Sequence, residues 1–166
     1  MELRELFSDL IRFETELWNA VDERLRVEVG LPLSRFEPLQ VIDRLGACRV
    51  HDIARELSIT AGGVSKLVDR TESAGLCRRR ANPVDGRSSI IELTAAGRRV
   101  LTSALEVFDN ELQTQLGSAL PEAELEHFGR TLARLRAHRS HLASSKLLAG
   151  SVAQLTDRVA VEGSNR

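Results

Sequence analysis

Residues 59–76 read ITAGGVSKLVDRTESAGL, and this segment decides the fold. Its apolar residues recur at the spacing of a helix that buries one face, at Val64, Leu67 and Val68. Thr60 can cap the start of this helix, and Gly75 stands where a left-handed residue would end it. We therefore predict a helix over about residues 61–74.

The elements on either side complete a recognisable layout. An apolar pattern predicts a short helix over residues 50–57, which a three-residue turn at 58–60 joins to the next helix. Two strands are predicted at 76–80 and 88–93, and the Asn, Pro, Asp and Gly of residues 81–87 supply the turn between them. Short helix, turn, helix and basic hairpin form a winged helix-turn-helix, so we expect a mainly α fold with a small β-wing.

Helical spacing also precedes this lobe. A long first helix is predicted over about residues 2–28. Ser34 can cap a second helix, with Glu37 completing a capping box, and the pattern stops near Gly46. We expect the acidic residues of the first helix to be solvated charges at Glu14, Glu16, Asp22 and Glu23.

Three further helices are predicted after the hairpin. Thr94 can cap a fifth helix whose apolar positions run to Leu116, and Pro121 can open a sixth with heptad-like spacing. A seventh helix is predicted over about residues 145–160, because apolar residues repeat there at Leu148, Val152, Leu155 and Val159. An ordered terminus must be tied down, so this helix is expected to pack on another element.

Composition excludes several classes of protein. The 166 residues suit one domain with appendages, and 42% apolar with 28% charged residues is typical of a folded chain. No apolar run approaches the roughly 18 residues of a membrane span, and the start lacks a signal-peptide core, so we expect a cytoplasmic protein. No phosphate loop, nucleophile elbow or paired carboxylates are present, so we predict no catalytic residues, no cofactor and no enzyme.

The net charge of −1 hides an asymmetry along the chain. Residues 60–100 carry eight basic and four acidic residues, a net +4, whereas the rest carries 15 basic and 20 acidic residues, a net −5. A basic middle segment is typical of a module that binds a polyanion. The alternative is a solvated basic face without a partner.

The outward face of the helix over 61–74 suits a major groove, because its residues are small or polar. Lys66 and Arg70 lie four residues apart on one face and can reach guanine edges or phosphates. Gly62 and Gly63 each cost a helix roughly 1 kcal/mol. Either a close approach to DNA or packing against the preceding helix would explain the pair.

These features resemble the MarR (multiple antibiotic resistance regulator) family of bacterial transcription factors. Beyond residues 59–76, the resemblance rests on residues 82–88 (NPVDGRS), residues 92–94 (ELT) and Gly97, and it covers about residues 10–140. The family's wing pattern, Asp-x-Arg followed by a small residue, is matched by Asp85, Arg87 and Ser88.

The resemblance implies a homodimeric repressor that binds a pseudo-palindromic site in double-stranded DNA. It divides the chain into an N-terminal dimerisation helix (1–33), a DNA-binding lobe (34–100) and C-terminal dimerisation helices (101–166). It also implies that Arg87 enters the minor groove and that Asp85 orients it. The DNA-binding residues that we predict are Thr60, Ala61, Gly62, Ser65, Lys66, Asp69, Arg70, Arg80, Asp85, Arg87, Ser88 and His51.

Family members commonly bind small aromatic anions, and Arg12 with Trp18 could line such an effector pocket. The alternative, which we favour, is that Trp18 packs in the dimer core. Cys48 and Cys77 are interpreted as structural rather than redox-active. We predict no metal site, because metal-ligand spacing is lacking among His51, His127, His138 and His141.

Two other functions remain open at this point. A ligand-independent architectural protein would bind duplex DNA without sequence preference. A winged helix used for protein–protein contact would not bind duplex DNA at all, even at low salt.

Overall fold

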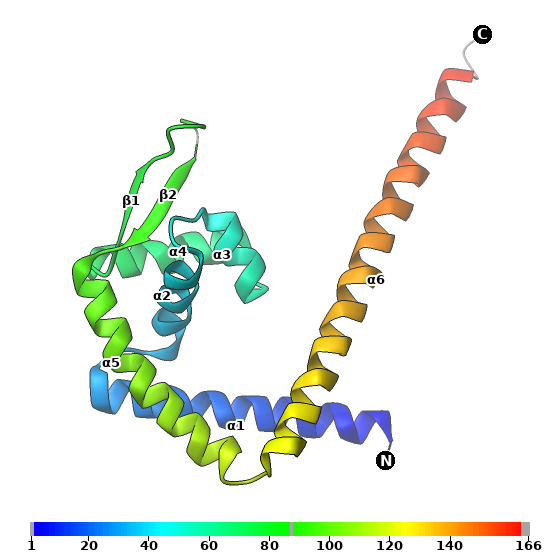
Figure 1. The fold of residues 1–166 in the computed structure, drawn as a ribbon. Coiled ribbons are helices and arrows are strands. Elements are labelled where there is room, and N and C mark those ends of the chain that lie inside the picture. Colours follow the sequence, from blue (N-terminus) through cyan, green and yellow to red (C-terminus); the bar gives the residue numbers. More distant parts are fainter. Residues whose placement is uncertain (1, 87, 164–166) are drawn as a thin grey trace. The chain divides into compact units, whose positions relative to one another are not determined.

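The computed structural model describes the backbone of residues 2–86 and 88–163, with side chains to residue 142. The chain divides into two compact units, residues 1–115 and 116–166. The fold is mainly helical with one antiparallel sheet, as predicted (Figure 1). In chain order the elements are α1 (Leu3–Val29), α2 (Leu33–Leu45), α3 (Val50–Leu57), α4 (Ala61–Ser73), β1 (Cys77–Ala81), β2 (Ser89–Leu93), α5 (Ala95–Leu112), a π-helical turn (Gln113–Gly117) and α6 (Glu122–Gly163).

Helix α2 forms the centre of the first unit, where it contacts α1, α3, α4, α5 and β2. Its Phe36 and Leu39 are fully buried, and the Phe36 ring lies 4.7 Å from that of Phe108 on α5. The surrounding elements complete the core with Ile53, Val64, Val68, Ile91, Leu93, Leu101 and Ala104. Burial of these side chains fixes α4 and the wing on one scaffold.

Helix ends that depend on local sequence are confirmed. Thr60 accepts a hydrogen bond from the N–H of Gly63 at 3.1 Å, so it caps α4 as predicted. Thr94 caps α5 in the same way by accepting the N–H of Gly97 at 2.9 Å. Gly75 has φ of 72°, the left-handed conformation that favours glycine after a helix. Helix α3 has the bounds that we predicted.

The start of α2 differs from the prediction. The capping box of Ser34 and Glu37 is wrong, because the helix begins two residues earlier and its N-cap is Pro32. Proline offers no side-chain acceptor, so the first turn takes one from another helix. The N–H of Leu33 donates to Oδ1 of Asp22 on α1, at 2.7 Å.

The carboxylate of Asp22 is therefore more than a solvated charge. It also accepts a hydrogen bond from Arg26 at 2.5 Å. Desolvation acts to raise the pKa of Asp22, but the hydrogen bonds from Arg26 and Leu33 outweigh it and the pKa is lowered. Glu37, in contrast, lies inside α2, where partial burial raises the pKa of its carboxyl.

The wing contains more pairing than the hairpin alone. Strands β1 and β2 pair with Cys77 opposite Leu93. On the other side of β2, Cys48 exchanges two backbone hydrogen bonds with Ile91, of 3.1 and 2.7 Å. The link before α3 thus adds an isolated β-bridge to the two-stranded sheet, which anchors the wing to the helical lobe.

The junction between the wing and α5 is very tight. A Cβ atom on Gly97 would lie 1.9 Å from the carbonyl oxygen of Leu76. That oxygen is itself held by the N–H of Thr94, at 3.1 Å. The close approach leaves room for glycine alone at this position.

The prediction of a separate seventh helix over 145–160 is wrong, because α6 continues unbroken over Glu122–Gly163. Residues 142–146 (LASSK) hold no proline or glycine that would end a helix, and a single glycine at Gly150 is tolerated inside one. The proposed packing of Leu148 and its apolar neighbours lies outside the residues whose side chains are described. Among the helices of the described residues, none has the length and apolar character that crossing a membrane requires.

Candidate nucleic-acid interface

Helix α4 has one buried and one exposed face. Val64, Val68 and Thr71 are fully buried. Lys66 and Arg70 are exposed on the opposite side. No ion pair to either cation is found among the described residues, so both charges are available to an external anion.

Arg79 of β1 fastens the wing to α4. Its guanidinium donates to Glu72 at 2.5 Å and to Asp69 at 2.6 Å, and its backbone N–H donates to Glu72 at 2.7 Å. The same guanidinium reaches the carbonyl oxygen of Ser65, at 3.4 Å. Partial burial acts to lower the pKa of Arg79, but the hydrogen bonds to Glu72 and Asp69 outweigh it and the pKa is raised. We call Arg79 with its three partners the clamp.

The clamp changes the interpretation of Asp69. We predicted that Asp69 faces DNA, and its side chain is indeed exposed, yet its carboxylate is engaged by Arg79. Sequence reasoning missed this pairing, because the two residues are ten positions apart and belong to different elements. Asp69 lies on an exposed helix face, and its near neighbours in the sequence give no sign of such a partner.

Another acid moderates the charge of the hairpin. Glu92 on β2 accepts from Arg78 at 2.8 Å and from Arg80 at 3.4 Å, both across the strand pair. Hydrogen bonding to Arg78, followed by its charge and by Arg80, holds the pKa of Glu92 below its usual value. Two arginines that count as free cations in the sequence therefore share one carboxylate, and Arg80, predicted to contact DNA, is one of them.

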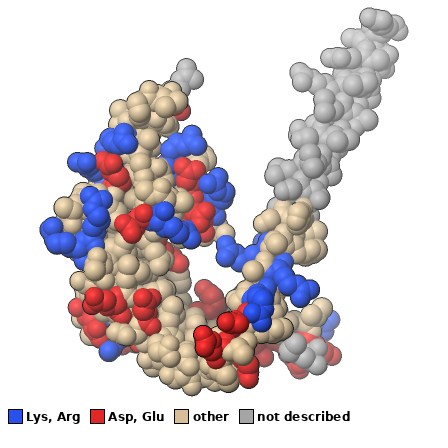
Figure 2. Space-filling model, viewed as in Figure 1, with Lys and Arg blue, Asp and Glu red and all other residues tan. Residues whose placement is uncertain are grey.

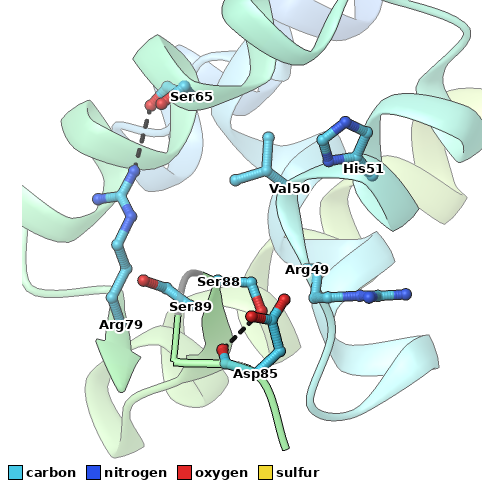
Figure 3. A pocket seen from close by; sticks show the side chains of 8 residues that line it. All are labelled: Arg49, Val50, His51, Ser65, Arg79, Asp85, Ser88 and Ser89. Carbon is cyan, nitrogen blue, oxygen red and sulfur yellow. Dashed lines mark hydrogen bonds between the residues drawn. The ribbon is translucent and has the colours of Figure 1, made fainter. Parts of the chain in front are cut away.

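A hollow of about 550 Å³ lies between the start of α3, the middle of α4 and the wing (Figure 3). It brings together four predicted DNA-binding residues, which are His51, Ser65, Asp85 and Ser88. The remaining lining residues are Arg49, Val50, Arg79 and Ser89.

The wing turn beside this hollow is internally bonded. Ser88 donates its N–H and its hydroxyl to the carbonyl oxygen of Asp85, at 3.0 and 3.1 Å. Asn82 donates to the Ser88 hydroxyl at 2.8 Å and accepts the N–H of Val84 at 3.0 Å. Arg87, the arginine predicted to enter the minor groove, lies outside the described residues.

A second basic segment was missed by our charge count. Residues 127–156 contain five basic residues and three histidines but no aspartate or glutamate. In the part of α6 with described side chains, four exposed arginines lie at Arg130, Arg134, Arg136 and Arg139. Figure 2 shows this group on the second unit, whereas basic and acidic side chains are interspersed over the first. A sliding window of charge would have found it.

The remaining candidate residues are those considered for effector binding, redox sensing and metal binding. Arg12 and Trp18 are exposed on α1. Cys48 and Cys77 are buried, and desolvation raises the pKa of each thiol to about 11. Within the described part of the chain, no three His, Cys, Asp or Glu side chains are grouped to hold a metal ion.

The chain was compared with known proteins. The model of the MarR family matches residues 31–89. An uncharacterized protein of Mycobacterium tuberculosis, Rv2011c, is 30% identical in an alignment of 142 residues that covers 83% of this chain and 97% of that protein. The uncharacterized HTH-type transcriptional regulator YfiV of Bacillus subtilis is 24% identical over 61% of this chain, and the match spans 62% of its own length.

Solved structures share the fold. Sco3205, a MarR family transcriptional regulator from Streptomyces coelicolor solved in complex with DNA, superposes with a TM-score of 0.74 at 22% identity, covering 80% of this chain and 87% of its own. BpsR from Bordetella bronchiseptica, whose DNA binding is regulated by 6-hydroxynicotinic acid, superposes with a TM-score of 0.72 at 20% identity, covering 79% and 98%.

Proposed function

This chain belongs to the MarR family of DNA-binding transcriptional regulators, which are not enzymes, and we propose that it acts as a homodimeric repressor. In this proposal it works in the cytoplasm, binds a pseudo-palindromic operator in double-stranded DNA, and is released by a small ligand. Each α4 enters a major groove and each wing follows the adjacent minor groove.

The observation that carries the proposal is the exposed Lys66 and Arg70 on a helix whose buried face is fixed in the core. Arg70 is assigned to a guanine edge and Lys66 to a base or phosphate. The cap at Thr60 leaves the positive end of the helix dipole toward the DNA backbone. His51 and Ser88, which both line the hollow, are assigned to phosphates.

In the wing we assign Arg87 to the minor groove, where a guanidinium senses groove width and potential. Asp85 is proposed to orient that arginine. Asp85→Ala then weakens operator binding although it removes a negative charge near DNA. Operator affinity at fixed salt decides the matter, since tighter binding by the variant would contradict the orienting role.

Exposed apolar side chains support the homodimer. Leu3 is 82% exposed and Phe7 65% exposed on α1, and Leu135 is 54% exposed on α6. Apolar surface of this extent is typical of an interface. With two-fold symmetry, the half-sites are centred about one helical turn, roughly 10 bp, apart.

An effector site is proposed by analogy with BpsR, whose DNA binding a small aromatic acid regulates. Arg12 and Trp18 on α1 supply a cation and an aromatic surface for such a ligand, as the alternative to Trp18 packing in the dimer core. Trp18 fluorescence in the presence of a panel of aromatic acids is the direct test, and a Trp18→Phe variant that still loses DNA on adding the same acid would remove Trp18 from the site.

The whole proposal is tested by sequencing the genomic fragments that the purified protein retains. We expect one enriched inverted repeat, and Arg70→Ala to cost about 1–3 kcal/mol on it while relaxing preference at one base pair per half-site. Arg44→Ala removes an exposed arginine of α2 that pairs with Glu56; it is the matched control and should bind as wild type. Retention of DNA fragments that share no sequence motif would indicate an architectural protein. Failure to retain any DNA at low salt would indicate a module for protein–protein contact.

A further inference from the structure

We propose that Gly62 is the point of closest approach between α4 and DNA, where the helix backbone lies so near the groove that a Cβ atom has no room. The inference rests on the proposed entry of α4 into the major groove. It assigns a positioning role to the absence of a side chain, at a residue that the sequence predicts only to bind DNA.

The fold explains Gly63 but not its neighbour. A Cβ atom on Gly63 would lie 3.2 Å from Oγ1 of Thr60, the atom that caps the helix, so a side chain there would press on the cap. A Cβ atom on Gly62 would meet nothing within 4 Å. The φ angle of Gly62 is not positive, so any residue can adopt its backbone conformation. Packing against α3 is therefore the wrong explanation for Gly62.

The position of Gly62 indicates what does explain it. Residues three, four and seven positions on lie along the same side of a helix, which places Gly62 in line with Ser65, Lys66 and Asp69. These residues lie on the side of α4 that faces away from the core. Glycine inside a helix is destabilising, and no contact within the described residues offsets that cost. The compensation then comes from the partner that α4 touches.

The dimensions of the groove agree with this reasoning. A helix with its side chains is about 10–12 Å across, and the major groove is about 12 Å wide. A first turn without side chains can sit deeper than one that carries them. Deeper seating brings Lys66 and Arg70 within reach of base edges, so a side chain at position 62 would act by lifting both away from the DNA.

The test is a size series at this position with a matched glycine elsewhere. Gly62→Ala and Gly62→Leu are compared with Gly129→Ala on α6, where a Cβ atom also meets nothing within 4 Å. All three variants should keep or raise the thermal midpoint, because alanine and leucine favour a helix over glycine. Operator affinity by fluorescence anisotropy should fall about 10-fold for Gly62→Ala and about 100-fold for Gly62→Leu, and stay at the wild-type value for Gly129→Ala.

The outcomes separate this inference from the proposed function. If wild type binds its operator and Gly62→Ala or Gly62→Leu binds equally well, the close approach is refuted and the repressor proposal stands. If Gly62→Ala lowers the thermal midpoint, a contact within the fold explains the glycine and the inference is again overturned. If the wild-type protein retains no duplex DNA, the proposed function falls and the inference falls with it.

Discussion

The winged-helix lobe buries its large apolar residues, whereas the two long helices, α1 and α6, leave many of theirs exposed. In the lobe, residues such as Phe36, Ile53 and Ile91 are completely buried. On α6, by contrast, no residue from 122 to 142 is buried, and large apolar side chains on the first half of α1 are exposed. The lobe therefore has its own core, whereas the described parts of the long helices carry apolar surface that we propose to be covered in the homodimer.

The largest effect is expected from a substitution that breaks the lobe. Gly97→Ala places a methyl group against the Leu76 carbonyl oxygen, which is backbone and already hydrogen-bonded. We expect a loss of about 3 kcal/mol or more in the free energy of unfolding, measured by urea titration with circular dichroism. Gly129→Ala is the control and should lose nothing; equal stability of both variants would contradict the tight junction.

The next effect concerns the long helices alone. A Phe7→Asp/Leu10→Asp double variant should weaken the dimer roughly 100-fold, because four apolar side chains of the symmetric interface become charged. Sedimentation equilibrium gives the dissociation constant. Val84→Asp is the control, since Val84 is 92% exposed on the wing and lies outside the proposed interface. A dimer of undiminished strength in the double variant would locate the interface elsewhere.

A smaller effect tests the link between the two regions. Asp22→Ala removes the acceptor for Leu33 at the start of α2 and should cost about 1 kcal/mol at pH 7. Because the pKa of Asp22 is lowered in the fold, this contribution is present above the ordinary pKa of an aspartate and is lost as the pH falls through the lowered pKa of the folded state. The stability difference between wild type and variant should therefore shrink as the pH falls below about 4. A difference that does not change with pH would show that the charge plays no part.

The smallest effect is expected at the cysteines. With thiol pKa values of about 11 and full burial, Cys48 and Cys77 should react slowly with a thiol reagent in the native protein. Treatment with peroxide should leave operator affinity unchanged, as should Cys77→Ser if its fold is intact by circular dichroism. A loss of DNA binding that a reductant restores would identify a redox switch instead.

Sequence reasoning succeeded where the cause is local. Thr60 and Thr94 cap helices through bonds to residues three positions on, and the turn residues at 81–87 located the strands on either side. It failed where a partner comes from another element. Asp22 supplies the hydrogen-bond acceptor that Ser34 was expected to supply, and Arg79 donates a hydrogen bond to Asp69. Pairings between positions so far apart leave no periodic signal in the sequence.

The glycine pair shows the same limit at the site itself. From the sequence, Gly62 and Gly63 were equally well explained by packing or by DNA. Only the positions of the surrounding atoms separate them, since Thr60 lies against one and nothing in the fold lies against the other. The order and type of the DNA-binding elements could be predicted, but the individual roles within them required the structure.

The clamp has a thermodynamic consequence for recognition. Because Arg79 joins β1 to α4 in the free protein, the entropy of ordering the wing against the helix is lost when the chain folds. Docking on DNA then buries a preformed surface, and the large heat-capacity decrease of coupled folding and binding is not expected from these elements. Among the described residues of α4, the exposed cations that the proposed function orders on the operator are Lys66 and Arg70, so the enthalpy of binding by this helix should reflect contacts rather than rearrangement.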